Sequence, residues 1–545
     1  MDEAEWWRGA VIYEVYLQSF CDGNGDGIGD LPGLLTRLDY IASLGVDAVW
    51  ITPFYRSPMA DCGYDVSDYC AVDPRYGTLA DFDRVVSRAK ALGLKVLTDQ
   101  VWSHTSSEHP WFAESPSSRD NDKADWFVWA DPSPDGGPPN NWLSAFGGPA
   151  WKWEPARRQY YLHHFLPNQP KLDLTNERVL AAHFANAEFW LRRGVDGFRF
   201  DAVDFMLHDD ALRDNPPDPT ASPTAWNPFR LQRHIHDMCQ PTSQVLMSRI
   251  RRFMDRFPDC ATIGEMSSEV GALGRIANMT GNTKLHMAYT LGVMKSAFGP
   301  AMIRGAIEEA AVLNRTGWLC WGFSNHDVDR VATRWNAGGK EPERFARLLL
   351  ALLACLPGSI CLYQGEELGL PNAELPLEAI RDPFGLTFLP AYRGRDGART
   401  PMPWIAGAHQ AGFTRAATSW LPIPECHIAL AVDRQEENSE STLACYRRLL
   451  AWRKEHPALR LGDLELIALP EPVVAWRRRY QDDSVTAFFN ISDRPVIVQP
   501  NDVEAFKPAC ELGFVTAPKD GALRLPPYGV SLGTENRDRQ PLQRG

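Results

Sequence analysis

The fold is decided by a stretch that joins one helix directly to one strand, residues 78–99, TLADFDRVVSRAKALGLKVLTD. Thr78 and Asp81 have the spacing of a capping box, which predicts that a helix begins there. Apolar residues then recur at helical spacing until Gly93, and residues 94–99 form a short apolar strand. A helix that leads straight into a strand is the repeating unit of a parallel sheet covered by helices.

The alternation of apolar strand and amphipathic helix extends far beyond this unit. Short apolar runs predict strands at residues 10–20, 46–52, 94–99, 197–201, 261–264, 285–289, 318–324 and 359–363. Helical patterns lie between them, such as the one through Leu34, Leu38 and Ile41 that stops at Gly45. Eight strands with intervening helices predict an α/β fold of the (β/α)8 TIM-barrel type, in which active groups lie at the carboxyl ends of the strands.

Two segments break the alternation and predict structure outside the barrel. Residues 105–172 are dense in Pro, Gly, Asn and Trp, which predicts a loop-rich subdomain inserted after the third strand. The last segment alternates apolar and polar residues between turn signals, which predicts a C-terminal antiparallel β-sandwich domain. The expected domains are the first part of the barrel at 1–104, the inserted subdomain at 105–172, the second part of the barrel at 173–455 and the β domain at 456–545.

Length and charge limit the classes of function. The chain has 545 residues, more than one hydrophobic core usually serves, and a net charge of −13. This charge argues against a nucleic-acid partner, because such binding depends on Lys and Arg that neutralise phosphates. Residues 1–7 lack the basic and apolar regions of a signal peptide, and no long apolar run suggests a membrane span. We expect a cytoplasmic monomer or homodimer with a small neutral substrate and no membrane partner.

Four short sequences place polar side chains where predicted barrel strands end. They are DQVWSH at 99–104, GFRFDA at 197–202, IGE at 263–265 and FSNHD at 323–327. The carboxyl ends of barrel strands meet at one rim, so these carboxyl and imidazole groups are expected to lie together. A single Asp in such a place is more often a helix cap or a surface residue. Four such ends together indicate an active site built from carboxylates.

These four sequences resemble the signature regions of the α-amylase family of glycoside hydrolases, and the resemblance covers nearly the whole chain. Three further runs resemble the bacterial α-glucosidase and oligo-1,6-glucosidase branch of that family. They are DGNGDGIGD at 22–30, DCGYD at 61–65 and RDGARTPMPW at 395–404. Endo-acting amylases generally lack this combination. The resemblance therefore implies an exo-acting enzyme.

The resemblance implies that Asp201 is the nucleophile, Glu265 the general acid/base and Asp327 a transition-state stabiliser. A retaining glycosidase needs one carboxylate to attack the anomeric carbon and a second carboxyl, about 5 to 5.5 Å away, to protonate the leaving oxygen and later activate water. Arg199 stands two residues before Asp201 on the same strand and so points to the same face. Its charge is expected to keep Asp201 ionised, while Glu265 stays protonated in the resting enzyme.

The resemblance also implies which residues bind the sugar. These are His104 and His326 at ring hydroxyls, Asp61 and Arg399 at the non-reducing end, and Tyr64 beneath the ring. Taken alone, a His or Tyr is more often a satisfied core residue. In related enzymes the residue after the nucleophile lines the aglycone side, with Val associated with α-1,6 linkages and Ala or Thr with α-1,4 linkages. Ala202 therefore points to α-1,4-linked substrates.

The run at 22–30 also has the opening of an EF-hand calcium loop. An EF-hand needs a bidentate Glu at its twelfth position, and Gly33 stands there, so an EF-hand is excluded. Hard oxygen ligands suited to calcium or magnesium remain at Asp22, Asn24, Asp26, Asp30 and the carbonyl of Ile28. The resemblance implies a structural Ca or Mg ion at this loop, and no organic cofactor. The alternative is a metal-free turn of Asx and Gly residues.

The sequence predicts a retaining, exo-acting α-glucosidase that takes terminal α-1,4-linked glucose from maltose, short malto-oligosaccharides or small α-glucosides, with transglucosylation. Three alternatives stay open. They are a sucrose- or trehalose-directed hydrolase or isomerase, an oligo-1,6-glucosidase, and a non-catalytic barrel protein that acts as a partner. The chain also departs from the usual pattern of the family at Glu14, where relatives usually have Gln, and at Ser103, often Asn. Ser is shorter than Asn and cannot reproduce its amide hydrogen bonds.

Overall fold

An eight-stranded parallel sheet forms the centre of the molecule. In this computed structural model, residues 5–222, 224–267, 271–313, 317–336, 338–499 and 506–535 are described. The strands follow the order β11-β10-β9-β5-β2-β1-β13-β12. Their bounds are β1 Val11–Val15, β2 Ala48–Ile51, β5 Lys95–Gln100, β9 Gly197–Phe200, β10 Ala261–Met266, β11 Met287–Thr290, β12 Cys320–Gly322 and β13 Ser359–Tyr363.

The sheet closes on itself as a barrel. Its two outer strands, β11 and β12, meet through a parallel bridge between Ala288 and Leu319. Every residue of β1, β2, β9 and β10 is buried, as expected for parallel strands that are covered on both faces. The predicted TIM barrel is confirmed, and each of its eight strands overlaps one of the predicted runs.

Helices follow most of the barrel strands. The longer ones are α1 Leu31–Ser43, α2 Leu79–Ala91, α4 Glu177–Arg192, α5 Ser243–Met254, α6 Ala272–Met279, α8 Pro300–Leu313, α10 Pro342–Cys355 and α14 Thr442–Glu455. Shorter helices are α3 Pro110–Glu114, α7 Leu291–Lys295, α9 Val331–Arg334, α11 Pro383–Phe388, α12 Glu425–Ile428, α13 Val432–Glu436 and α15 Pro457–Leu461. The capping box predicted at Thr78 and Asp81 is present at the start of α2.

The segment after the third barrel strand forms a small separate sheet, with the order β6-β8-β7. Its strands are β6 Trp129–Ala130, β7 Trp151–Glu154 and β8 Gln159–Leu162. A further two-stranded sheet, β3 Tyr55–Arg56 with β4 Asp68–Val72, belongs to the loop after β2. These two small sheets belong to loops at the carboxyl ends of the barrel strands. The polar signature residues lie at the same end of the barrel.

The C-terminal segment is an antiparallel β structure. A five-stranded sheet has the order β14-β15-β16-β20-β18, and β17 pairs with β19. The strands are β14 Asp463–Ile467, β15 Val473–Tyr480, β16 Asp483–Asn490, β17 Val496–Val498, β18 Phe506–Pro508, β19 Leu523–Leu525 and β20 Val530–Glu535. The two sheets share an apolar cluster that contains Ala475, Phe488 and Leu523.

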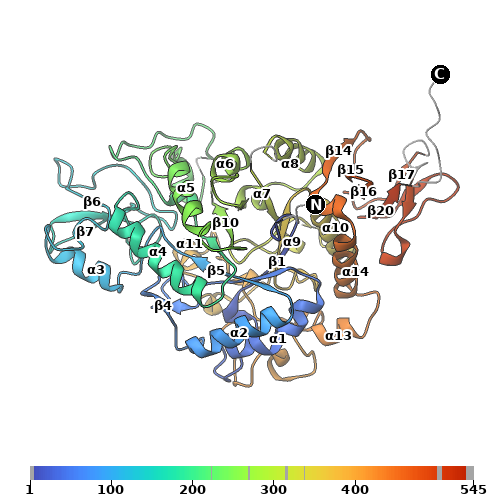
Figure 1. Cartoon of the computed structure of the whole chain (residues 1–545), viewed down its shortest axis with the longest axis horizontal. Coiled ribbons are helices and arrows are strands. Elements are labelled where there is room, and N and C mark those ends of the chain that lie inside the picture. The colour runs from blue at the N-terminus through green and yellow to red at the C-terminus, as the bar shows by residue number, and fades with distance from the viewer. Residues whose placement is uncertain are drawn as a thin grey trace.

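The C-terminal sheet is attached to the barrel beside α10 and α14 (Figure 1). The Trp476 indole and the Arg478 guanidinium of β15 both donate to the carbonyl of Cys355, at 3.1 and 2.9 Å. In the same view, β6 and β7 lie at the opposite end of the molecule. In this view the barrel therefore lies between the inserted sheet and the C-terminal sheet.

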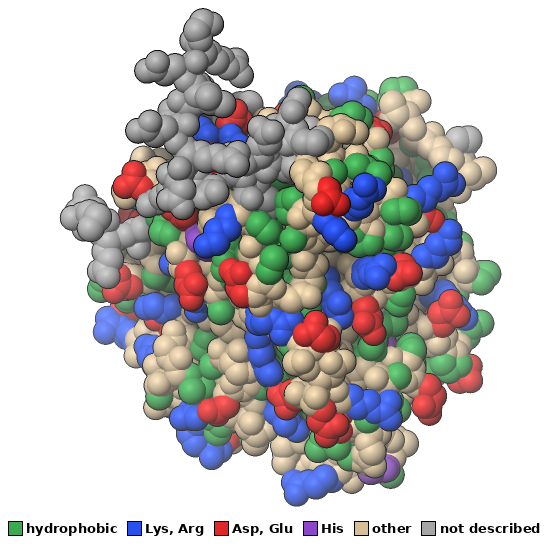
Figure 2. Space-filling model, turned by 90° about the vertical axis from the view of Figure 1, so that its right-hand side faces the viewer, with side chains coloured by type: hydrophobic (Ala, Val, Ile, Leu, Met, Phe, Trp, Pro, Cys, Tyr) green, Lys and Arg blue, Asp and Glu red, His purple; other side chains and the backbone are tan. Residues whose placement is uncertain are grey.

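The surface carries charges of both signs. Lys and Arg side chains are interspersed with Asp and Glu on the face shown in Figure 2. Such mixing gives no extended basic stripe on that face of the kind that holds a phosphate backbone. Within the described ranges, no helix combines the length and apolarity that a membrane crossing needs.

Candidate active site

Side chains from all parts of the barrel meet at the carboxyl rim of the strands. Asp201 follows β9, Glu265 lies near the end of β10, and His326 and Asp327 follow β12. Asp61 and Tyr64 belong to the loop after β2, and His104 to the loop after β5. The parallel register of β5, β9 and β10 places these chain ends side by side. The strands thus bring together residues that are far apart in sequence.

The Arg199 guanidinium joins the acids at the centre of this rim. It is fully buried and contacts Asp99 and Asp201, both at 2.7 Å, and Glu265 at 2.5 Å. The Tyr289 hydroxyl lies 2.9 Å from the same guanidinium. Since one planar group touches both Asp201 and Glu265, the two carboxyls face a common space. Sequence reasoning named Arg199 as the partner of Asp201 and did not anticipate its contacts with Asp99 and Glu265.

Burial dominates the protonation of the two acids. It raises the pKa of Glu265 to about 8 and the pKa of Asp201 to about 7, while Arg199 acts in the opposite direction on both. The expectation that Arg199 keeps Asp201 fully ionised is therefore corrected, because desolvation outweighs that charge and the pKa of Asp201 is raised. The raised pKa keeps a proton on Glu265, as the role of a general acid requires.

Asp327 has the opposite environment. Its carboxylate accepts from the guanidinium groups of Arg395, at 2.9 Å, and Arg399, at 2.7 Å. Burial alone would raise the pKa of Asp327, but these two guanidinium groups hold it well below its usual range. Asp327 therefore stays negatively charged near neutral pH.

Arg395 links two predicted site residues that do not touch each other. It donates to Asp61 and Asp327, both at 2.9 Å, and to Asp382 at 2.7 Å. Arg399, which the sequence assigned with Asp61 to the non-reducing end of the sugar, bonds to Asp327 and to the carbonyl of His326. Arg395 was missed as a site residue, although the run 395–404 that contains it had been recognised. Its place at the start of this motif was the only feature of the sequence that could have marked Arg395 as a site residue.

Both histidines of the rim are neutral and engaged. Burial lowers the pKa of His104 and of His326 to about 3. Nε2–H of His104 donates to the Tyr64 carbonyl at 3.0 Å, so its Nδ1 accepts from the Ser103 hydroxyl at 2.8 Å. The Tyr64 ring stacks on His326, with centroids 5.3 Å apart and planes 10° from parallel. The serine that replaces the usual Asn thus orients His104.

Ala202 lies directly beside the reacting groups. Its backbone has φ 39° and ψ 54°, the left-handed region that non-Gly residues rarely adopt. In this conformation its N–H donates to the Glu265 carboxyl at 3.2 Å. Its methyl group belongs to an apolar cluster with Phe205 and Met238. The strained backbone therefore serves to direct a donor at Glu265.

The long loop after β9 packs against α11 near the same rim. Trp226 stacks on Tyr392, with centroids 4.7 Å apart and planes 15° from parallel, and lies 4.9 Å from Phe388. The neighbouring Phe384 ring lies 5.9 Å from the Arg395 guanidinium. An aromatic wall therefore extends from this loop to the residues that bind Asp61 and Asp327.

The loop of residues 22–30 lies apart from the acids and is held by its own hydrogen bonds. The Asp22 carboxylate accepts from the N–H groups of Gly25 and Gly27, at 2.6 and 2.8 Å. Asp30 caps α1 by accepting from Gly33 at 2.6 Å. Asn24 and Asp26 accept from the N–H groups of Asp26 and Ile28, both at 2.9 Å.

The structure also explains why Gly33 stands at the twelfth position. A Cβ there would lie 1.9 Å from the carbonyl oxygen of Cys21, so no larger residue fits. Among the residues that the structure describes, no three His, Cys, Asp or Glu side chains are grouped closely enough to hold a metal ion. The oxygen donors of the loop match the chemistry of calcium or magnesium, but its carboxylates are directed at backbone N–H groups.

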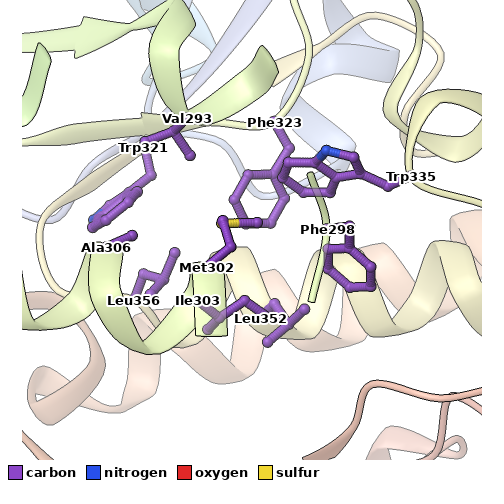
Figure 3. Close-up of a pocket in the computed structure, with 10 residues that line it drawn as sticks. All are labelled: Val293, Phe298, Met302, Ile303, Ala306, Trp321, Phe323, Trp335, Leu352 and Leu356. Carbon is purple, nitrogen blue, oxygen red and sulfur yellow. The ribbon is translucent and has the colours of Figure 1, made fainter. Parts of the chain in front are cut away.

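A small cavity beside β12 is chemically unlike the rim. Figure 3 shows side chains of β12, α8 and α10 around it, among them Trp321, Met302 and Leu352. Its volume is about 20 Å³, and its lining is apolar. That is space for about one water molecule, without the polar partners a water needs. A sugar ring cannot bind there, so the polar rim is the candidate substrate site.

Comparison with known proteins agrees with this geometry. Residues 14–462 match the model of the α-amylase catalytic domain. The chain is 47% identical to a probable α-glucosidase of Rhizobium meliloti (strain 1021), and the match covers 97% of both chains. It is 34% identical to an oligo-1,6-glucosidase of Heyndrickxia coagulans, over 91% of this chain and 94% of that one.

A solved structure extends the agreement to three dimensions. The crystal structure of the α-glucosyl transfer enzyme XgtA superposes with a TM-score of 0.93 at 48% identity, and covers 98% of this chain and 100% of that one. The match to the family model spans most of the chain and includes every acid of the rim. The chain therefore belongs to the α-amylase family and is a glycoside hydrolase of the α-glucosidase and oligo-1,6-glucosidase kind.

Proposed function

We propose that this protein is a retaining, exo-acting α-glucosidase that removes terminal α-1,4-linked glucose from maltose, short malto-oligosaccharides or small α-glucosides. The observation that carries the proposal is the Arg199 guanidinium, which contacts Asp201 at 2.7 Å and Glu265 at 2.5 Å. This shared contact holds the two carboxyls on one side of a common space, as a double displacement at one carbon requires.

Each acid has an environment suited to one role. Glu265, whose pKa is raised to about 8, keeps a proton that it donates to the leaving glycosidic oxygen. Asp201 then attacks the anomeric carbon and forms a glycosyl ester, and Glu265, now deprotonated, removes a proton from the incoming water or sugar hydroxyl. Asp327 remains negatively charged and stabilises positive charge at the ring carbon in both transition states.

The arginines of the rim support exo action. Arg395 forms ion pairs with Asp61, Asp327 and Asp382. We propose that this network forms one end of the site. Asp61 and Arg399 are the groups we assign to the non-reducing end of the terminal glucose, and His104 and His326 those we assign to its hydroxyls. Because buried polar groups lose their partners when a hydroxyl is absent or inverted, such a site would select glucose strongly.

We propose that the linkage preference rests on Ala202, which directly follows the nucleophile and packs with Phe205 and Met238. We also propose that sugars compete with water as acceptors, which makes the enzyme partly a transglucosidase. The relative named as an oligo-1,6-glucosidase favours a second candidate, cleavage of α-1,6 linkages. Sucrose- or trehalose-directed chemistry would use the same acids.

Product analysis separates these candidates. Purified enzyme is incubated with maltose, isomaltose, sucrose or trehalose, and the products are quantified over time. We expect the fastest release of glucose from maltose, with longer oligosaccharides at high maltose concentration. An Asp201→Asn variant should lose at least about 10⁴-fold in turnover, because removing a nucleophile typically costs more than that. Near-wild-type turnover by this variant would refute the assignment.

We further propose that the loop of residues 22–30 binds one Ca or Mg ion with a structural role. The ligands would be Asp22, Asn24, Asp26, Asp30 and the carbonyl of Ile28. Their oxygen chemistry supports the proposal. The loop is connected to the rim, because Trp420 donates to Gly27 and to Ser19, and Ser19 donates to the Arg399 carbonyl. An ion here would stiffen that connection.

A further inference from the structure

Glu14 is a further acid near the rim, and the proposed reaction does not use it. It lies in β1, opposite Trp50 of β2 and Tyr363 of β13, and is fully buried. Its Oε1 lies 2.6 Å from Nδ1 of His326 and 3.4 Å from the His326 backbone nitrogen. Within the described part of the chain, its Oε2 has no hydrogen-bond partner. Within the described residues, the side-chain hydrogen bonds of Glu14 therefore all go to His326.

His326 continues a chain of hydrogen bonds toward the reacting acids. Its Nε2 lies 2.8 Å from the Tyr64 hydroxyl, and this hydroxyl lies 3.1 Å from the Asp99 carboxylate. Asp99 is bound by Arg199, which also contacts Asp201. The chain thus runs from Glu14 through His326, Tyr64 and Asp99 to the guanidinium of Arg199.

Counting protons along this chain limits its possible states. The Tyr64 hydroxyl has one proton, and neutral His326 has one. If both end carboxyls were ionised, the three contacts between Glu14 and Asp99 would have only two protons. All three are satisfied when one end carboxyl is protonated. The extra proton must therefore reside on either Glu14 or Asp99.

The surroundings of the two carboxyls decide between them. Asp99 accepts from Arg199 at 2.7 Å and from the Trp50 indole at 3.2 Å, so a negative charge there is compensated. Glu14 has an unpartnered oxygen in a buried position, where a charge is costly. Burial also raises the pKa of Glu14 well above its ordinary value, against the pull of Arg199. The proton therefore belongs at the Glu14 end.

We propose that Glu14 is a positioning residue that fixes the tautomer of His326, an inference that rests on the proposed function. Protonated Glu14 donates to Nδ1, so the imidazole proton resides on Nε2 and points toward Tyr64 and the sugar. His326 thereby acts as a donor toward the substrate. The other titratable groups around Glu14 are Arg199, Asp99, Asp327, Tyr289, Cys361 and Tyr363.

Nitrogen NMR of the resting enzyme tests the tautomer directly. Full-length enzyme is labelled with ¹⁵N-histidine, and the His326 signals are assigned by their loss in His326→Asn. At pH 6 we expect the protonated nitrogen of His326 to be Nε2 and the unprotonated one Nδ1. The reverse pattern would overturn the proposal. This readout needs no substrate, so it stands apart from the proposed activity.

Substitution of Glu14 gives a second, kinetic test with p-nitrophenyl α-glucoside. Glu14→Gln offers an amide N–H to Nδ1, so it should keep the Nε2–H tautomer and at least about one third of the wild-type kcat/KM. Glu14→Met has similar size and no donor, so kcat/KM should fall about tenfold or more, roughly the effect of one lost buried hydrogen bond. Glu366→Gln, another buried carboxyl, serves as the control and should stay near wild type.

The outcomes are distinguishable. Equal losses in Glu14→Gln and Glu14→Met, with both folded by circular dichroism, would overturn the positioning role. Wild-type activity in Glu14→Met would overturn it as well. A wild-type enzyme that hydrolyses no α-glucoside would instead refute the proposed function, and the NMR result would still decide the tautomer.

Discussion

At the scale of single residues, the centre of the molecule is one arginine shared by three acids. Arg199 is fully buried with Asp99, Asp201 and Glu265 around it. Breaking a buried ion pair by removing one partner typically costs about 3–5 kcal/mol, because it leaves uncompensated charge. Arg199 is therefore needed for the fold as well as for the positions of the two carboxyls.

The raised pKa of Glu265 predicts how stability depends on pH. The carboxyl titrates near its ordinary value in the unfolded chain and near 8 in the folded one. Its buried neutral form stabilises the fold fully below the ordinary value, and this stability is lost as the pH rises toward 8. Glu265→Gln cannot ionise. Wild type should therefore lose stability between pH 5 and pH 8, and the variant should not. We expect the Tm of the variant minus the Tm of wild type to be about 2 °C or more larger at pH 8 than at pH 5.

Differential scanning calorimetry at the two pH values checks this prediction. Glu455→Gln is the control, because Glu455 is exposed at the end of α14 and pays no burial penalty. Its Tm difference from wild type should be the same at both pH values. A Tm difference of Glu265→Gln that is independent of pH would show that Glu265 is not held neutral by burial.

Arg395 gives a second prediction at this scale. It donates to Asp61, Asp327 and Asp382 through its planar fork. Lysine cannot reach three carboxylates in this geometry. Arg395→Lys should therefore raise KM for maltose and lower kcat/KM by about tenfold to a hundredfold, since one to two charged hydrogen bonds are lost. Steady-state kinetics on maltose measure both constants. An unchanged KM in Arg395→Lys would argue against a role of this network in substrate binding.

Residue-level predictions from the sequence depended on motifs. The three acids and Arg199 were found because they end predicted strands. Arg395 was missed because its partner Asp61 is 334 positions away, and only the closed barrel brings them together. The net upward pKa shift of Asp201 was also missed, because burial at the rim is a property of the packed structure.

At the scale of elements, the end of β9 is where we propose that the linkage preference resides. Ala202 adopts φ 39°, a conformation that β-branched residues tolerate poorly. Ala202→Val adds two methyl groups on the leaving-group side and strains this turn. We expect activity on maltose to fall about tenfold or more while activity on isomaltose falls less, because Val is associated with α-1,6 linkages in related enzymes.

The ratio of kcat/KM for isomaltose to that for maltose measures this effect. Ala202→Ser is the matched control, because it changes the side chain with little added volume and no β-branch. Equal losses on both sugars in Ala202→Val would mean that the substitution only strains the backbone. The linkage preference would then reside in another part of the rim.

The elements themselves were largely predictable. Apolar runs bounded by turn signals predicted the positions of β1, β2, β5, β9, β10, β11, β12 and β13, and β13 has the predicted bounds of 359–363. The run at 10–20 was predicted too long, because β1 ends at Val15 and the chain then turns into the rim. Such ends depend on the neighbouring strands, which a local pattern does not contain.

At the scale of the whole molecule, the loop of residues 22–30 is linked to the active rim through Trp420, Ser19 and Arg399. If the loop binds a divalent ion, removal of the ion should affect both stability and the site. We expect dialysis against EDTA to lower Tm by several degrees and added Ca or Mg to restore it. An Asp26→Asn variant should need more ion for the same Tm.

Thermal scans with and without added ion check this expectation. A Tm that is the same in EDTA and in excess calcium or magnesium would contradict a structural ion at this loop. In that case the hydrogen bonds of Asp22 and Asp30 to backbone N–H groups would suffice to hold the loop. The connection to Arg399 would then be maintained by Trp420 and Ser19 alone.

The sequence predicts the arrangement of strands and helices more fully than it predicts which loops touch one another. Strand and helix alternation was enough for the barrel, and polar–apolar alternation for the C-terminal sheets. The packing of Trp226 against α11, and the three acids around Arg395, join loops from distant strands. No local pattern encodes which loops meet above a closed barrel.

The central claim is that Asp201 forms a covalent bond to glucose during turnover. The most direct test is to incubate the enzyme with 5-fluoro-α-glucosyl fluoride, which slows breakdown of a glycosyl ester, and to map the labelled peptide by mass spectrometry. We expect one fluoroglucosyl group per chain, on Asp201, with loss of activity in step with labelling. Label on a different residue, or full activity in a chain labelled at Asp201, would contradict it.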